Sequence, residues 1–243
     1  MAYAADILDS YPRDAYELSP AYKAIYAAEY KANREGDDVA SGAAQKLEQW
    51  MHRKVASVAG GPILEIGAGT LNHRQYEAAD AVYDIVEPFT SLYAGKPELA
   101  SIRDVYDFQA DVPAERRYKR IISIAVLEHL HDLPREVAMS VIRLDDDGVY
   151  QAGIPSEGGL LWWLGWRGTT GLSFFLRHKM NYGEIMRHEH VSKAKDIVAV
   201  VRHFFDEVEL TRWPVPSDHA SFYQYIEARG PRKAVASRFL EAN

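Results

Sequence analysis

Residues 62–70 read Pro-Ile-Leu-Glu-Ile-Gly-Ala-Gly-Thr, a short apolar run that ends in two glycines one residue apart. The run predicts a buried strand, and the glycines allow a sharp turn in which the backbone comes close to a ligand that a Cβ atom would exclude. The helix expected after the turn presents free N–H groups at the same place. On this motif alone, a tight turn without a ligand is the alternative interpretation.

Apolar runs and helical segments alternate after this turn, which is typical of a parallel α/β sheet. A helix is expected over 132–144 and another over 191–205, while 207–214 and 221–230 would add a final antiparallel pair of strands. The sequence therefore predicts a mostly parallel seven-stranded sheet flanked by helices. The other five strands are expected at 62–67, 81–88, 101–106, 120–127 and 148–155.

Two segments lie outside this alternation. Residues 1–58 are predicted to be helical, with Pro20 after Ser19 as one helix start. Residues 156–187 contain tryptophans and phenylalanines interrupted by glycines, and we expect them to form a cap insertion after the fifth strand. Since no low-complexity linker separates these segments from the rest, residues 1–243 are predicted to form a single domain.

The composition excludes several classes of function. The chain has no cysteine, which excludes disulfides, thiolate nucleophiles and Cys-ligated metal sites. Its formal net charge of -7 disfavours nucleic acid as a partner. The longest apolar stretch, 160–176, is interrupted by Arg167 and by polar and glycine residues, so we expect no stable membrane insertion. The sequence start lacks the pattern of a secretory signal, so a cytoplasmic protein with a small-molecule partner is expected; the oligomeric state stays open.

Glu87 is the second feature of the expected site. It ends the second predicted strand, 22 residues after Glu65, where a carboxylate can accept hydrogen bonds from both hydroxyls of an adenosine ribose. A dinucleotide-binding turn would have a third glycine three residues after Gly69, where this chain has Asn72. The turn therefore favours a cofactor other than NAD, and an NAD(P)-dependent oxidoreductase is kept as an alternative.

Three stretches together resemble the class I S-adenosylmethionine (SAM)-dependent methyltransferases. They are LEIGAGT at 64–70, DIVEP at 84–88 and IISIAVLEHLHD at 121–132, the last being typical of the small-molecule branch called methyltransferase type 11. The resemblance covers about residues 45–210. It implies a Rossmann-like fold with SAM as cofactor. One departure is Leu71, where many relatives have a third glycine.

The resemblance also implies seven cofactor contacts, all at or just after the carboxyl ends of the first four strands. The implied contacts are Glu65, Gly67 and Gly69 for the methionine part, Glu87 for the ribose, Asp107 and Phe108 for the adenine, and Ala125 for the sulfonium.

Histidines on the expected acceptor side are candidate catalytic residues. His129 follows the fourth strand and His190 precedes a late helix, and a histidine near an acceptor hydroxyl can act as a general base. A packing role is the alternative for His129. The pairs 129/131 and 188/190 have the pattern His-x-His, but this spacing alone is weak evidence for a ligand set. A polar substrate lip is therefore favoured over a metal site.

The predicted cap supplies the remaining substrate contacts. We expect Trp162, Arg167, Tyr182 and His188 to contact the acceptor, because aromatic and arginine side chains can stack on a sugar ring or clamp a phosphate. They can equally hold an acyl chain or a membrane surface, or pack a cap or dimer contact without any substrate.

Similar sequences often accompany surface-polysaccharide assembly, so the resemblance favours methyl transfer to a sugar-linked or phosphate-type group. A lipid or other small-molecule methyltransferase is the alternative. A non-catalytic protein that keeps the cofactor fold is another.

Overall fold

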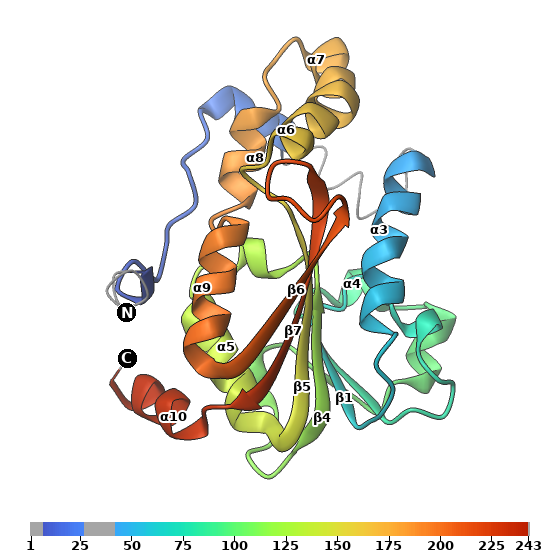
Figure 1. The fold of residues 1–243 in the computed structure, drawn as a ribbon. Coiled ribbons are helices and arrows are strands. Elements are labelled where there is room, and N and C mark those ends of the chain that lie inside the picture. Colours follow the sequence, from blue (N-terminus) through green and yellow to red (C-terminus); the bar gives the residue numbers. More distant parts are fainter. Residues whose placement is uncertain (1–6, 27–41, 243) are drawn as a thin grey trace.

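The computed structural model describes residues 7–26 and 42–242 and has one mixed sheet at its centre (Figure 1). Its strand order is β3-β2-β1-β4-β5-β7-β6, with β1 to β5 parallel and β7 antiparallel to both β5 and β6. The predicted sheet is therefore confirmed. The strands are β1 (Ile63–Ile66), β2 (Tyr83–Val86), β3 (Asp104–Tyr106), β4 (Tyr118–Ile124), β5 (Leu144–Pro155), β6 (Phe205–Pro214) and β7 (Ser221–Pro231).

The chain reverses its direction of travel across the sheet at β1. Strands β2 and β3 lie on one side of β1, whereas β4 and β5 lie on the other. In such open sheets the loops after the two central strands separate and leave a crevice at their carboxyl ends, where ligands bind. Both central strands are buried on their two faces, which explains their nearly continuous apolar sequences.

Helices cover both faces of the sheet (Figure 1). On one face lie α3 (Gly42–Val55) and α4 (Thr90–Tyr93), and on the other lie α5 (Leu133–Arg143), α9 (Ala194–Phe204) and α10 (Lys233–Ala242). An apolar stripe drives this packing in α9, because its four inward side chains are fully buried and each contributes about 1.5–3 kcal/mol. They are Ile197, Val200, Val201 and Phe204.

The segment after β5 forms short helices that lie together at one end of the sheet (Figure 1). They are α6 (Leu160–Trp166), a π-helical turn (Arg167–Gly171), α7 (Leu172–His178) and α8 (Gly183–Glu189). Among the described residues, none of the helices is both long and apolar enough to cross a membrane.

Part of the N-terminal region differs from the predicted helix. Residues 11–19 form no helix, and they run beside the loop after β4 and the start of α9. The Arg13 N–H donates to the His131 carbonyl (2.8 Å), and the Arg13 guanidinium donates to Asp196 (2.9 Å). The His131 carbonyl thus pairs with a backbone N–H that would form a helical hydrogen bond in a helix. The helix predicted from Pro20 is present over 20–26, and its continuation falls in 27–41, outside the described residues.

Candidate cofactor and acceptor site

The turn after β1 has the backbone conformation that its glycines allow. Gly67 has φ +70° and Gly69 has φ +52°, both in the left-handed region. A Cβ atom on Gly67 would lie 2.5 Å from a methyl of Val126, so packing against the loop after β4 excludes any side chain there. A Cβ atom on Gly69 would meet nothing within 4 Å. The turn is therefore closely packed on one side and open on the other.

The carboxylate of Glu87 lies against this turn. It accepts one hydrogen bond from the Gly69 N–H (2.8 Å) and one from the Phe89 N–H (3.0 Å). These bonds join the turn after β1 to the end of β2. Each carboxylate oxygen has a second lone pair, so Glu87 can still accept hydrogen bonds from a ligand.

Glu65 is buried beneath the same edge, with 3% of its surface exposed. Its carboxyl accepts a hydrogen bond from the Tyr83 hydroxyl (2.9 Å). Burial raises the pKa of Glu65 to about 8, because the surroundings disfavour its charged form more than the Tyr83 bond favours it. A cationic group placed beside this carboxyl would lower its pKa again and would be held by the resulting ion pair.

The other three predicted cofactor residues are exposed at the carboxyl ends of β3 and β4. Asp107 and Phe108 follow β3, and Phe108 is 62% exposed. Ala125 follows β4 and has φ +55°, an unusual conformation for a residue with a side chain and one that is concentrated at functional sites. All seven predicted cofactor residues thus lie along the carboxyl ends of four adjacent strands.

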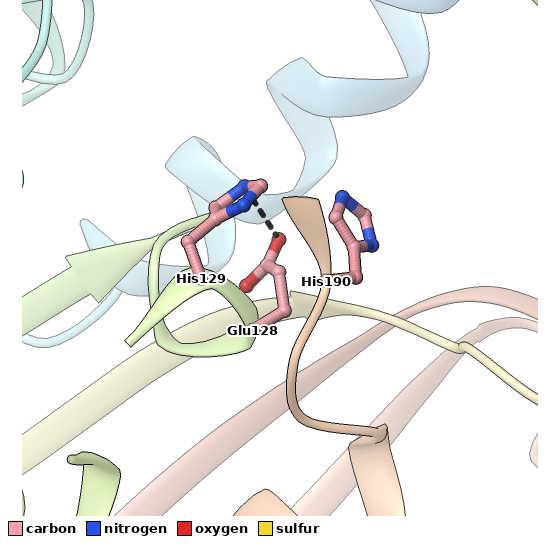
Figure 2. A group of neighbouring side chains, drawn as sticks. All are labelled: Glu128, His129 and His190. Atoms are coloured by element: carbon pink, nitrogen blue, oxygen red, sulfur yellow. Dashed lines mark ion pairs between the residues drawn. The ribbon is translucent and has the colours of Figure 1, made fainter. Parts of the chain in front are cut away.

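The two candidate catalytic histidines lie beside each other, with Glu128 between them (Figure 2). The rings of His129 and His190 meet edge to face with centroids 4.7 Å apart. Glu128 Oε1 lies 4.0 Å from His129 Nε2. One potential ligand atom from each of the three residues lies within 4.8 Å of the others.

Hydrogen bonds fix how the two rings are turned. His129 Nδ1 lies 2.9 Å from the Glu189 carbonyl, which can only accept, so Nδ1 is the protonated nitrogen. His190 Nδ1 bonds to the carboxylate of Glu157. The Glu128 carbonyl accepts from Val191 N–H (2.9 Å) and holds the loop after α8 against the loop after β4.

Burial and neighbouring charges shift the pKa values of this group in different directions. Burial and the neighbouring His190 lower the pKa of His129. Burial also acts to lower the pKa of His190, but the bond to Glu157 and the negative charges of Glu157, Glu128 and Glu189 together outweigh it, and the net pKa is raised. Burial raises the pKa of Glu128 to about 7. The cluster therefore offers both proton donors and proton acceptors near neutral pH.

A pocket of about 530 Å³ lies between α6, α8 and the loop before β7, and His190 is the member of the cluster that lines it. Its lining includes His190 and Glu157 together with Trp162 and Arg167, two of the four predicted substrate residues. The Arg167 guanidinium also lies 4.4 Å from the ring centre of Trp163, within the range of a cation–π contact.

The other two predicted substrate residues lie elsewhere. Tyr182 packs on Trp166 and Phe174 in the cap and lines a neighbouring hollow. His188 forms a hydrogen bond to the carbonyl of Tyr16 (2.8 Å), so its ring is turned toward the N-terminal segment.

Glu157 is the main site residue that the sequence analysis missed. It comes two residues after β5, at the same carboxyl edge as the cofactor residues. Ligands bind at the carboxyl ends of the strands in such sheets. A search for polar residues just after β5, like the one made after β1–β4, would have identified Glu157.

No protein-family model and no curated protein matches the chain. Solved structures do match. A 1,6-didemethyltoxoflavin N1-methyltransferase of Burkholderia thailandensis has 17% identity, a TM-score of 0.55, and coverage of 90% of this chain and 93% of that one. The N-methyltransferase NodS of Bradyrhizobium japonicum has 14% identity, a TM-score of 0.52, and coverage of 77% and 87%.

A SAM-dependent methyltransferase of Thermotoga maritima has 13% identity and a TM-score of 0.52, with coverage of 76% of this chain and 90% of that chain. At these identities the similarity concerns the fold. The strand order, the turn after β1 and these neighbours together show that the chain has the Rossmann-like fold of class I SAM-dependent methyltransferases.

Proposed function

We propose that the chain is a SAM-dependent methyltransferase that acts on a small polar molecule. The observation that supports it most is the open glycine turn after β1 with the Glu87 carboxylate bonded to Gly69 N–H. The neighbours from Bradyrhizobium and Burkholderia were both solved with S-adenosylhomocysteine (SAH), the product form of the cofactor.

The residues present suit each part of SAM. The open side of Gly69 leaves room for the methionine part, and the buried carboxyl of Glu65 suits its cationic amino group. Glu87 can accept the ribose hydroxyls, and the exposed ring of Phe108, with Asp107 before it, can frame the adenine. Ala125 would lie beside the sulfonium. When bound, SAM supplies a methyl group on positively charged sulfur, so the protein has chiefly to align and desolvate the nucleophile.

The acceptor would bind in the pocket beside His190. Trp162 and Trp163 offer flat apolar faces, and Arg167, Arg187 and Lys193 offer positive charge. This combination suits a sugar-linked or phosphate-type group.

His129 and His190 would form the polar end of the pocket and take part in proton transfer when the acceptor is a hydroxyl. A role in surface-polysaccharide assembly stays a prediction from the sequence.

A lipid-linked acceptor is a second candidate, favoured by the exposed apolar side chains of the cap. Several large apolar side chains are exposed there within one short stretch, which is unusual for a surface that contacts only water. Binding to phospholipid vesicles would favour this acceptor class over a free sugar or phosphate. These side chains are Leu160, Trp163, Leu164, Leu172, Phe175 and Leu176.

Calorimetric titration tests the proposal. SAH should bind, and NADH should not. Glu87→Gln should weaken SAH binding at least about tenfold, because one charge-assisted acceptor of the ribose hydroxyls is lost. Glu98→Gln is the matched control, since Glu98 lies in the first turn of a 3-10 helix before β3 and outside the proposed site. Binding of NADH alone would support the oxidoreductase instead.

The non-catalytic alternative needs a separate test. Once an acceptor is found, methyl transfer should fall in Glu87→Gln in step with the loss of cofactor affinity. SAH binding with no methyl transfer to any sugar, phosphate or lipid tested would favour a protein that only binds the cofactor.

A further inference from the structure

The carboxylate of Glu128 has an unusual environment. The residue is 2% exposed, and its Oε2 atom is buried without a hydrogen-bond partner among the described residues. An unsatisfied buried carboxylate oxygen is costly, and such groups in native proteins generally have a catalytic or ligand-binding reason. The groups beside Glu128 are two histidine rings, so the carboxylate points to a ligand that imidazole nitrogens also bind.

Both histidine rings have the hydrogen bonds that are typical of metal ligands. Metal-bound histidines usually donate their second N–H to a backbone carbonyl or a carboxylate, which sets the tautomer and the ring orientation. His129 Nδ1 donates to the Glu189 carbonyl, and His190 Nδ1 bonds to the Glu157 carboxylate. Each ring thus has Nε2 left to bind an ion.

We propose that Glu128, His129 and His190 bind a first-row divalent transition metal ion such as Zn²⁺. Two imidazoles and one carboxylate match the three protein ligands of open zinc sites, whereas Mg²⁺ and Ca²⁺ prefer oxygen ligands alone. The three ligand atoms lie within 4.8 Å of one another. Ligands about 2.1 Å from one ion lie roughly 3.4 Å apart in a tetrahedron, so binding would draw them about 1 Å closer.

The position of the cluster suggests what the ion does. His190 and its partner Glu157 both line the pocket, so an ion bound to His190 would lie at the edge of the space where the acceptor would bind. There the ion would bind an oxygen of the acceptor, either a hydroxyl or a phosphate oxygen, and hold it in place. This role rests on the proposed function, whereas binding of the ion does not.

The structure also separates the members of the two His-x-His pairs. Only one histidine of each pair belongs to the cluster. His131 bonds to the Arg13 carbonyl (2.6 Å) and His188 to the Tyr16 carbonyl (2.8 Å), both in the N-terminal segment. Spacing alone could not distinguish these roles, and the unused members provide matched control variants.

Calorimetry with Zn²⁺ and visible spectroscopy with Co²⁺ test the site, on full-length protein stripped with chelator and free of any histidine tag. One ion should bind with Kd on the order of 1 μM or tighter. His129→Ala and His190→Ala should weaken Zn²⁺ binding at least about 100-fold, and Glu157→Gln about 10–100-fold. His129→Ala is the decisive variant, because 42% of its side chain is exposed and its removal leaves the core intact.

His131→Ala and His188→Ala should keep the affinity of the wild type. His52→Ala should also keep it, and this control excludes the other histidine pair, whose Nδ1 atoms in His52 and His73 lie 3.1 Å apart. Absence of Zn²⁺ and Co²⁺ binding, or unchanged affinity in folded His129→Ala, would overturn the metal site. SAH titrated into the same samples keeps the two proposals apart, because SAH binding without ion binding would overturn only the metal site.

Discussion

Leu71 combines a strained backbone conformation with a side chain that is buried in the core. It has φ +62° where many methyltransferases have glycine, yet its side chain is only 1% exposed. The left-handed conformation costs a residue with a Cβ atom about 1–2 kcal/mol. Burial of a leucine side chain contributes about 1.5–3 kcal/mol, so packing offsets the strain and makes a third glycine unnecessary.

Leu71→Gly should therefore destabilise the protein, although it restores the residue that relatives use. Loss of the buried side chain costs about 2–5 kcal/mol and relief of strain returns about 1–2 kcal/mol. We expect a net loss of about 2 kcal/mol in the free energy of unfolding, measured by urea denaturation. A variant more stable than the wild type would show that strain dominates at this position.

Phe108→Ala should affect the cofactor and not stability. The ring is 62% exposed, so its removal opens no cavity. If the ring stacks on adenine, SAH affinity should fall about 10-fold, corresponding to about 1–2 kcal/mol of stacking. The measurements are SAH calorimetry and urea denaturation; unchanged SAH affinity would place the adenine elsewhere.

Because the carboxyl of Glu65 is buried, we expect it to make the folded protein less stable as the pH rises, the opposite of the usual effect of a carboxylate. Its pKa is about 8 in the folded protein against 4.5 for an exposed glutamate, so the folded state binds the proton more tightly. The tighter proton binding stabilises the folded protein against unfolding. This contribution to the free energy of unfolding is complete below about pH 4.5 and is lost as pH rises toward 8. Glu65→Gln mimics the protonated form and keeps an acceptor for Tyr83. The Tm of this variant relative to the wild type should rise between pH 5 and 8; a constant difference would contradict the shift.

At the scale of elements, a buried network around Arg120 joins β4 to β5, to the end of α3 and to the loop before β2. Arg120 in β4 is 1% exposed and donates two hydrogen bonds to Glu77 (2.7 and 2.8 Å), one to Gln151 (2.8 Å) and one to the Val55 carbonyl at the end of α3 (3.0 Å). The sequence predicts that Arg120 begins the fourth strand. It could not identify Glu77, because 43 residues separate the two and only the folded sheet brings them together.

Arg120→Met should be strongly destabilising. The change leaves the Glu77 carboxylate buried beside a neutral side chain, which typically costs about 3–5 kcal/mol. Arg117→Met is the matched control, because Arg117 is exposed and bonds only to nearby carbonyls. Urea denaturation measures both. Similar stability of the two variants would show that the network contributes little.

Elements with local signals were predictable. Apolar runs and glycine turns identified the strands, most clearly the central parallel strands, which are buried on both faces and need such runs. Residues 11–19 were predicted wrongly as part of a helix, since their backbone and side chains bond to the loop after β4 and to α9. Partners more than 100 residues away leave no trace in local periodicity.

For the whole molecule, the cofactor half and the acceptor half of the proposed site differ in how far they can be predicted from local sequence. The proposed cofactor half comes from the ends of four adjacent strands, each with a local motif, so candidates for it can be named from the sequence. The acceptor half joins Glu128, Glu157 and His190, which belong to three separate loops. Their meeting depends on how the cap and the N-terminal segment pack over the sheet. Sequence identified both histidines but neither Glu157 nor the orientation of the two rings.

In the proposed enzyme, a SAM-binding edge and an acceptor pocket meet between the loops after β1, β4 and β5. A crystal structure with SAH bound would show whether they do. We expect ribose hydroxyls on Glu87, the sulfur beside Ala125, and a continuous space from the sulfur to His129 and His190. SAH bound away from the Gly67–Gly69 turn, or with its sulfur facing away from the pocket, would contradict this arrangement.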